Sequence, residues 1–173
     1  MLGLIYDSMM AQDGTALLYF PVYNDTGMKL DALPEMLTHP LALPGLSDGG
    51  AHVGTICDAS FTTFLMTHWA RDRDHGTIPL ERIIQMQARD TARFIGLEDR
   101  GVLEPGLRAD LNIIDFDNLE LLPPTMVNDL PAGGQRLMQH ARGYIATLVN
   151  GQVVSRNGAL TEARPGRLVR AGG

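Results

Sequence analysis

The sequence predicts an α/β fold over roughly its first hundred residues and a mainly β region after them. Three observations carry this prediction. Helix-like and strand-like segments alternate up to residue 48, apolar residues recur every three or four positions from Leu80 to Ile95, and Asn150-Gly151 lies between two β-branched runs. Hydrophobic residues make up 45% of the 173 residues and charged residues 20%, so we expect a packed core.

The first four elements are short. Residues 2–12 carry apolar residues at helical spacing, and Asp13-Gly14 is expected to end this helix. Residues 16–23 (ALLYFPVY) and 41–48 (LALPGLSD) have the composition of buried strands, and residues 30–39 that of a short helix. This alternation predicts a parallel sheet covered by helices.

Two longer helices follow, over residues 59–74 and 80–95. We expect Asp58 to lie near the N-cap of the first and Cys57 to be a small buried side chain. In the second, Pro79 lies in the first turn and Gly96 lies where a left-handed cap is favoured. We expect core packing with a surface salt bridge from His68, Trp69 and Arg71, and an inward-facing stripe from Leu80, Ile83, Ile84, Gln87, Ala88, Thr91, Ala92 and Ile95.

Beyond Gly101 the patterns indicate β-structure. Residues 111–114 form a β-branched strand, and Asn150-Gly151 is a strong hairpin signal. Residues 122–136, with their proline and glycine pairs, are expected to form a long loop. The glycines near its end would suit either an anion-binding nest or an ordinary loop, and Arg136 is the group there that could meet a substrate carboxylate.

The number of predicted strands in the first half is too small for an independent sheet. Two parallel strands are not stable alone, because parallel sheets need several strands and cover on both faces. We therefore expect a larger α/β body whose beginning is absent from this sequence, or a second copy that supplies the remaining strands.

Composition excludes several classes of function. The formal net charge of −6 and a pI near 5.2 argue against nucleic-acid binding. A single cysteine excludes a disulfide framework. The opening MLGLIYDSMM is too short and too soon interrupted by Asp7 for a signal peptide or membrane span, so we expect a cytoplasmic protein that does not bind membranes.

The segment LPGLSDGGAHVG (residues 43–54) is the main candidate for chemistry. An apolar run ends at Asp48, which is followed by Gly49 and Gly50 and then by His52. Glycines allow another group to approach the backbone closely. An aspartate at such a point is either a turn cap or a chemical group.

Six motifs along the chain are distinctive: PGLSDGGAHVG, ICDASF, LMTHWARDR, DTARFIGLEDRGVLEPGLRADLNIIDFD, DLPAGGQRL and ATLVNGQVVSRNG. Together they resemble the C-terminal part of the N-acyl-D-amino-acid deacylases (D-aminoacylases) of the amidohydrolase superfamily. The resemblance implies the last strands and helices of a metal-dependent (β/α)₈ barrel in residues 1–100. It also implies part of a small β-sandwich in residues 101–173.

The resemblance further implies a zinc-dependent hydrolase that removes the acyl group from small-molecule N-acyl-D-amino acids. Asp48 matches the aspartate at the end of the eighth barrel strand, which moves a proton between the attacking water and the leaving nitrogen. Asp48 is also a weak candidate metal ligand. Gly49 and Gly50 would keep the barrel mouth open to substrate, and His52 would contact substrate or hydrogen-bond Asp48.

Most zinc ligands of that family lie on segments absent from this sequence, which contains no His-X-His. We therefore expect the 173 residues alone to be inactive. The alternative from another class is a truncated, non-catalytic chain that acts as a binding or assembly module, or as half of a split enzyme. Its partner would then be a second copy or a complementary chain that completes the barrel.

Overall fold

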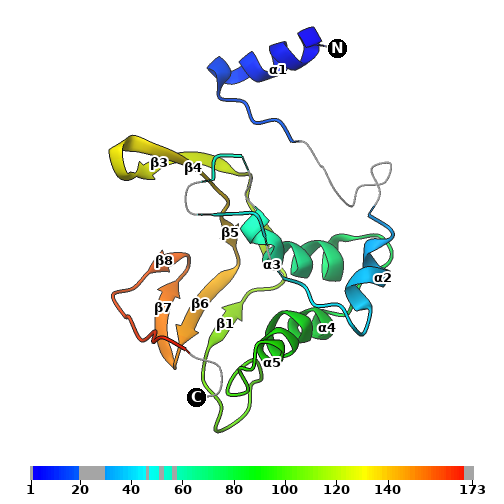
Figure 1. Ribbon diagram of the computed structural model, residues 1–173, viewed down its shortest axis with the longest axis vertical. Coiled ribbons are helices and arrows are strands. Elements are labelled where there is room, and N and C mark those ends of the chain that lie inside the picture. Colours follow the sequence, from blue (N-terminus) through cyan, green and yellow to red (C-terminus); the bar gives the residue numbers. More distant parts are fainter. Residues whose placement is uncertain (1, 20–29, 46, 51–52, 56–57, 170–173) are drawn as a thin grey trace.

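The computed structural model describes residues 2–19, 30–45, 47–50, 53–55 and 58–169. Helical segments come first, and strands follow from residue 111 onward (Figure 1). The helical elements are α1 (Leu2–Gly14), α2 (Leu33–Thr38), η1 (Asp58–Ser60), α3 (Phe61–Phe64), η2 (Leu65–Asp72), α4 (Leu80–Gln85), η3 (Met86–Asp90), α5 (Thr91–Phe94) and η4 (Pro131–Gly133). The strands are β1 (Leu111–Ile114), β2 (Glu120–Leu121), β3 (Thr125–Leu130), β4 (Gly134–Met138), β5 (Ala141–Arg142), β6 (Tyr144–Val149), β7 (Gln152–Arg156) and β8 (Ala159–Leu160).

Helix α1 confirms the first predicted helix and ends where the sequence indicated. Gln12, Asp13 and Gly14 adopt positive φ angles of 52°, 57° and 81°, which stop the helical hydrogen-bond pattern. The helix lies apart from the rest of the chain (Figure 1), and its apolar side chains face solvent. The exposed ones are Leu4, Ile5, Tyr6, Met9 and Met10. None of the helices in the described ranges is long and apolar enough to span a membrane.

The two predicted parallel strands do not form in the part of the chain that is described. Residues 16–19 and 41–45 belong to no strand, and Tyr19 and Leu41 are 91% and 90% exposed. Residues 20–23 and Leu46 lie outside the described residues. An apolar run becomes a buried strand only when neighbouring strands pair with its backbone, and the described residues provide no such neighbour.

All strand pairs formed by the described residues are antiparallel. The fold is therefore mixed α/β, as predicted, but the described residues do not form a barrel.

Two long helical stretches confirm the remaining helix predictions. The first runs through η1, α3 and η2, and the second through α4, η3 and α5. Pro79 stands at the N-cap of the second, and Gly96 follows its end with a φ of 78°. Helix α2 begins with Pro34 in its first turn, as expected.

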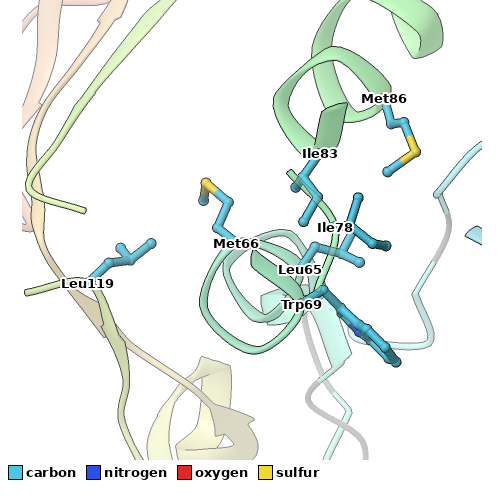
Figure 2. Packing of buried hydrophobic residues seen from close by; sticks show 7 residues of the cluster. All are labelled: Leu65, Met66, Trp69, Ile78, Ile83, Met86 and Leu119. Atoms are coloured by element: carbon cyan, nitrogen blue, oxygen red, sulfur yellow. The ribbon is translucent and has the colours of Figure 1, made fainter. Parts of the chain in front are cut away.

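The core lies where these two stretches pack together (Figure 2). The first stretch contributes Trp69, which is 1% exposed, and the second contributes Ile83 and Met86, which are fully buried. Leu119 extends the cluster into the β region. The cluster consists of Leu65, Met66, Trp69, Ile78, Ile83, Met86 and Leu119.

The predicted stripe of the second helical stretch is only partly correct. Ile83 and Ala92 are buried, but Ile84 and Ile95 are 42% and 58% exposed, and the stripe omitted Met86. The π-helical turn η3 explains part of this difference. A π-turn contains more residues than an α-turn, so the face after it is rotated relative to a uniform helical period.

The β region contains one four-stranded sheet of order β1-β6-β7-β8 and two hairpin-like pairs, β2-β5 and β3-β4. Strand β1 confirms the predicted strand at residues 111–114. Asn150 and Gly151, with φ angles of 50° and 76°, form the predicted tight turn between β6 and β7. A second Asn-Gly pair, residues 157–158, turns the chain from β7 into β8.

The predicted loop at residues 122–136 is wrong, because most of it is the hairpin of β3 and β4. The turn occupies only η4, where Ala132 and Gly133 have φ angles of 59° and 73°. The proline and glycine residues thus mark the turn, whereas Met126, Val127 and Leu137 lie in paired strands.

Arg71 connects the first helical stretch to the β region through hydrogen bonds. Its guanidinium pairs with Asp72 and donates to the carbonyl oxygens of Phe116 and Leu119. The predicted combination of a buried Trp69 with a surface salt bridge at Arg71 is confirmed. His68 stacks on Phe64, with ring centroids 4.6 Å apart.

Candidate functional site

Asp48 lies on the connection between α2 and η1, and it is exposed. Within the described residues, no hydrogen bond or ion pair holds its carboxylate. The preceding segment is not a strand, so the predicted position at a strand end is not reproduced in the described residues. Its role in proton transfer stays a prediction.

Gly49 lies in close contact with the start of the helical stretch. A Cβ atom built on Gly49 would be 2.9 Å from the backbone nitrogen of Ala59 and 3.0 Å from its Cβ. No side chain fits at that distance unless the backbone moves. The close approach that the sequence indicated at the glycine pair is therefore made at Gly49 by the protein's own chain. At Gly50, a Cβ would meet the side chain of Val53, at 3.1 Å, and no other atom of the described residues.

Strand β4 supports the same segment from its other end. The backbone N–H of Leu137 donates to the carbonyl oxygen of Val53 at 2.8 Å. Gln139, which directly follows β4, makes two further hydrogen bonds. Its side-chain carbonyl accepts from the hydroxyl of Ser60, and its side-chain amide donates to the carbonyl oxygen of Leu122 at 3.0 Å. Sequence reasoning did not find these contacts, because residues 17 or more positions apart leave no local pattern.

Arg136 is held by a cross-hairpin ion pair. Its Nε and Nη2 atoms lie 2.7 Å and 2.6 Å from the two carboxylate oxygens of Asp129. This guanidinium lowers the pKa of Asp129, and the carboxylate raises the pKa of Arg136. Contact of Arg136 with a substrate carboxylate stays a prediction, and it would have to compete with Asp129. His52 and Cys57 lie outside the described residues.

A second polar cluster, which the sequence did not reveal, surrounds Arg73. Its side chain is 9% exposed, lies 4.5 Å above the ring of Trp69 and donates to Asp31 at 2.9 Å. The hydrogen bonds from Arg73 and His75 lower the pKa of Asp31. Burial lowers the pKa of His68, and Arg73 lowers it further. This cluster ties the start of α2 to the first helical stretch.

The residues that are described do not fit a metal site by themselves. Among them, no group of three or more histidine, cysteine, aspartate or glutamate side chains is placed to hold a metal ion. Zinc in structural and catalytic sites needs at least three protein ligands. Asp48 could therefore serve a metal only together with ligands from outside the described part of the chain.

The chain is similar to several curated proteins. It is 33% identical over 133 residues to an s-triazine hydrolase of Gordonia rubripertincta, a match covering 75% of this chain and 27% of that protein. It is 29% identical over 160 residues to a 5-methylthioadenosine/S-adenosylhomocysteine deaminase of Nitratidesulfovibrio vulgaris (strain DSM 19637 / Miyazaki F), covering 88% of this chain and 34% of the relative. A deaminase of the same name from Desulfitobacterium hafniense (strain Y51) is 30% identical over 125 residues, covering 66% of this chain and 27% of the relative.

The chain thus spans about a third or less of the length of these relatives. No solved structure matches it significantly. The model of the amidohydrolase family matches residues 12–155. Because this match covers well over half of the sequence, the chain belongs to the amidohydrolase family.

Proposed function

We propose that this chain is part of a hydrolase that cleaves a carbon–nitrogen bond, with N-acyl-D-amino acids as substrates. The family match over residues 12–155 is the observation that carries the reaction class. Two relatives named as a triazine hydrolase and a deaminase are compatible with the same class of reaction. The narrower substrate rests on the resemblance of motifs such as PGLSDGGAHVG to D-aminoacylases.

In this proposal, Asp48 carries the proton transfer. The attacking water gives a proton to the carboxylate, and the carboxylic acid then gives it to the leaving nitrogen, so the group returns to its starting state. Two features of the chain support this role. The carboxylate is exposed on the connection between α2 and η1, and within the described residues no cation forms an ion pair with it.

The remaining parts of the site come from outside this sequence. Residues 1–100 would belong to a barrel and residues 101–173 to a β-sandwich, with zinc ligands supplied by the rest of a longer polypeptide or by a complementary chain. Zinc in such a site supplies activation of water at neutral pH. The short coverage of the relatives, 27% and 34%, supports the view that most of the enzyme lies elsewhere.

The experiment compares the 173-residue chain with a protein completed by the remaining barrel strands, both loaded with zinc. The substrates are N-acetyl-D-amino acids, their L-enantiomers, an s-triazine and 5-methylthioadenosine. We expect the chain alone to show no measurable turnover and the completed protein to hydrolyse the D-substrates. Hydrolysis of the triazine or release of ammonia from the nucleoside instead would contradict the substrate class but not the reaction class.

The Asp48 assignment is tested in the completed protein by Asp48→Asn. General acid–base catalysis contributes about 10²- to 10⁴-fold, so we expect kcat to fall at least about a hundredfold. Asp74→Asn is the matched control, because Asp74 is exposed and makes no ion pair among the described residues. An Asp48→Asn variant with the kcat of the unmodified protein would remove Asp48 from the mechanism.

A further inference from the structure

We propose that Gly49 is a positioning residue for Asp48. Only a residue without a side chain lets residues 47–50 lie directly against the backbone of Ala59. The inference rests on the proposed role of Asp48. It adds a residue whose function is steric and which touches no substrate.

Glycine is required at residue 49 because a Cβ atom would clash with Ala59, and not because the backbone adopts an unusual conformation. Gly49 does not have a positive φ, so alanine could adopt its backbone angles. The obstacle is the backbone nitrogen of Ala59 at 2.9 Å from an ideal Cβ, together with the Cβ of Ala59 at 3.0 Å. A flexible side chain could turn away, but a backbone atom at the start of a helical stretch cannot. Alanine at this position must therefore push the segment away from η1.

The segment is supported on its other side by strand β4. Val53 accepts the hydrogen bond from Leu137 at 2.8 Å, and its own N–H donates to the carbonyl of Gly50 at 3.4 Å. Leu137 is itself paired with Met126 of β3. Gly49, which follows Asp48, thus contacts the start of η1, while Val53, which donates to Gly50, is hydrogen-bonded to β4.

The two supports are also joined to each other. Ser60, next to Ala59, donates to Gln139, which follows β4, and the hydroxyl of Thr63 lies 2.7 Å from the hydroxyl of Tyr144 in β6. The helix start and the β region therefore form one polar junction. A displacement at Gly49 cannot be absorbed by moving η1 without breaking these hydrogen bonds.

Other glycines near the segment provide matched controls. Ideal Cβ atoms on Gly45 and Gly54 have no atom of the described residues within 4 Å, and neither residue has a positive φ. Gly54→Ala should therefore leave the position of Asp48 unchanged. Gly50→Ala is an intermediate case, because among the described residues its Cβ would meet only the tip of the Val53 side chain.

The first measurement uses the 173-residue chain as it stands. Amide hydrogen exchange of Leu137 reports the bond to Val53. We expect at least about tenfold loss of protection in Gly49→Ala and no change in Gly54→Ala. Equal protection in the two variants would show that a Cβ at residue 49 is accommodated without moving the segment, which would overturn the inference.

The second measurement uses the completed enzyme. A displacement of about 1 Å can cost up to about a hundredfold in rate, so Gly49→Ala should lower kcat at least about tenfold with KM within about twofold. The pH dependence of kcat should also shift, because the shifted carboxylate has a new environment. A rise in KM alone, or an unchanged kcat, would contradict positioning.

The two proposals fail in different ways. Unchanged activity in Asp48→Asn would reject the proposed function, whereas loss of activity in Asp48→Asn with an unaffected Gly49→Ala would reject only the positioning role.

Discussion

Single charged residues in this protein act mainly by holding connections between elements. Asp99 accepts hydrogen bonds from Arg100 at 2.9 Å and Arg108 at 2.8 Å, and Arg100 also reaches Asp110 at 3.0 Å. These residues lie on the link between α5 and β1. The hydrogen bonds from Arg100 and then Arg108 lower the pKa of Asp99 from 3.8 to about 2. The network therefore favours the folded link whenever Asp99 is ionised.

This depressed pKa predicts a specific dependence of stability on pH. A carboxyl group with a lower pKa in the folded state stabilises it above the unfolded pKa of 3.8, and this contribution is lost as the pH falls toward about 2. In the Asp99→Asn variant, the denaturation midpoint should therefore decrease less steeply than in the unmodified protein as the pH falls from 3.8 to about 2. Asp74→Asn should retain the slope of the unmodified protein. Parallel curves for Asp99→Asn and the unmodified protein would show that the group titrates alike in both states.

At the scale of elements, local patterns predicted most helices and turns but not the strands that depend on distant partners. The Asn150-Gly151 turn and strand β1 were found because their signals are local. Residues 16–19 have strand composition, yet they lack a neighbour within the described residues. Strands β3 and β4 lie where the sequence predicts a loop, because the proline and glycine residues mark only the turn between them.

In the candidate site, too, the local feature was predictable from the sequence and the long-range contacts were not. The Asp48-Gly49 step was predictable, since an aspartate before two glycines is a local signal. Its supports were not predictable, because Ala59 and Leu137 come from a helical turn and a hairpin that meet only in the folded chain. Local sequence thus identified a candidate group but not what holds it.

The contact between Gly143 and Leu119 predicts a large difference between two similar glycine substitutions. Gly143 and Gly106 have almost the same φ, 96° and 95°, but a Cβ on Gly143 would lie 2.7 Å from the Cα of Leu119, whereas Gly106 has open space. Both alanine variants incur the strain of a positive φ, about 1–2 kcal/mol. Gly143→Ala should lose about 2 kcal/mol more in the free energy of unfolding, because Leu119 must move out of the core. Chemical denaturation measures this, and equal losses would contradict the close-contact explanation.

At the scale of the whole molecule, the helical part and the β region share one small core. Leu119 is the buried side chain that the β region contributes to the core cluster, and Arg71 binds the adjacent carbonyl groups from the helical side. The ring of Phe116 lies 5.5 Å from the guanidinium carbon of Arg71. One side chain therefore bridges two regions that the sequence predicted to be separate domains.

Loss of the Arg71 bridge should weaken the whole fold. Arg71→Ala leaves the carbonyl groups of Phe116 and Leu119 without their charged donor, which is expected to cost about 2 kcal/mol in the free energy of unfolding. Arg93→Ala is the control, because the side chain of Arg93 is exposed and makes no hydrogen bond among the described residues, and it should change stability by less than about 0.5 kcal/mol. Chemical denaturation distinguishes the two variants, and similar losses would argue against a bridge.

Helix α1 exposes several large apolar side chains to solvent. Its apolar side chains point in several directions around the helix, and Leu4, Ile5 and Met9 are 73%, 44% and 54% exposed. A helix that exposes this many large apolar side chains is normally covered, because water contact with each such side chain costs free energy. The chain covers 27% and 34% of two curated relatives, and we expect another copy of the chain, or a complementary chain, to cover these side chains.

We therefore expect the isolated chain to self-associate through α1, with sedimentation velocity showing species larger than a monomer at micromolar concentration. Leu4→Lys combined with Met9→Lys should shift the distribution toward monomer, since both sides of the helix then carry a charge. Leu160→Lys is the matched control, because Leu160 is 81% exposed but lies on β8, away from α1 (Figure 1). If the control dissociated the assemblies as well as the α1 variant does, association would depend on general surface apolarity rather than on this helix. A complementary chain that covers α1 should compete with self-association, so its addition should replace the homo-oligomer by a complex of defined stoichiometry.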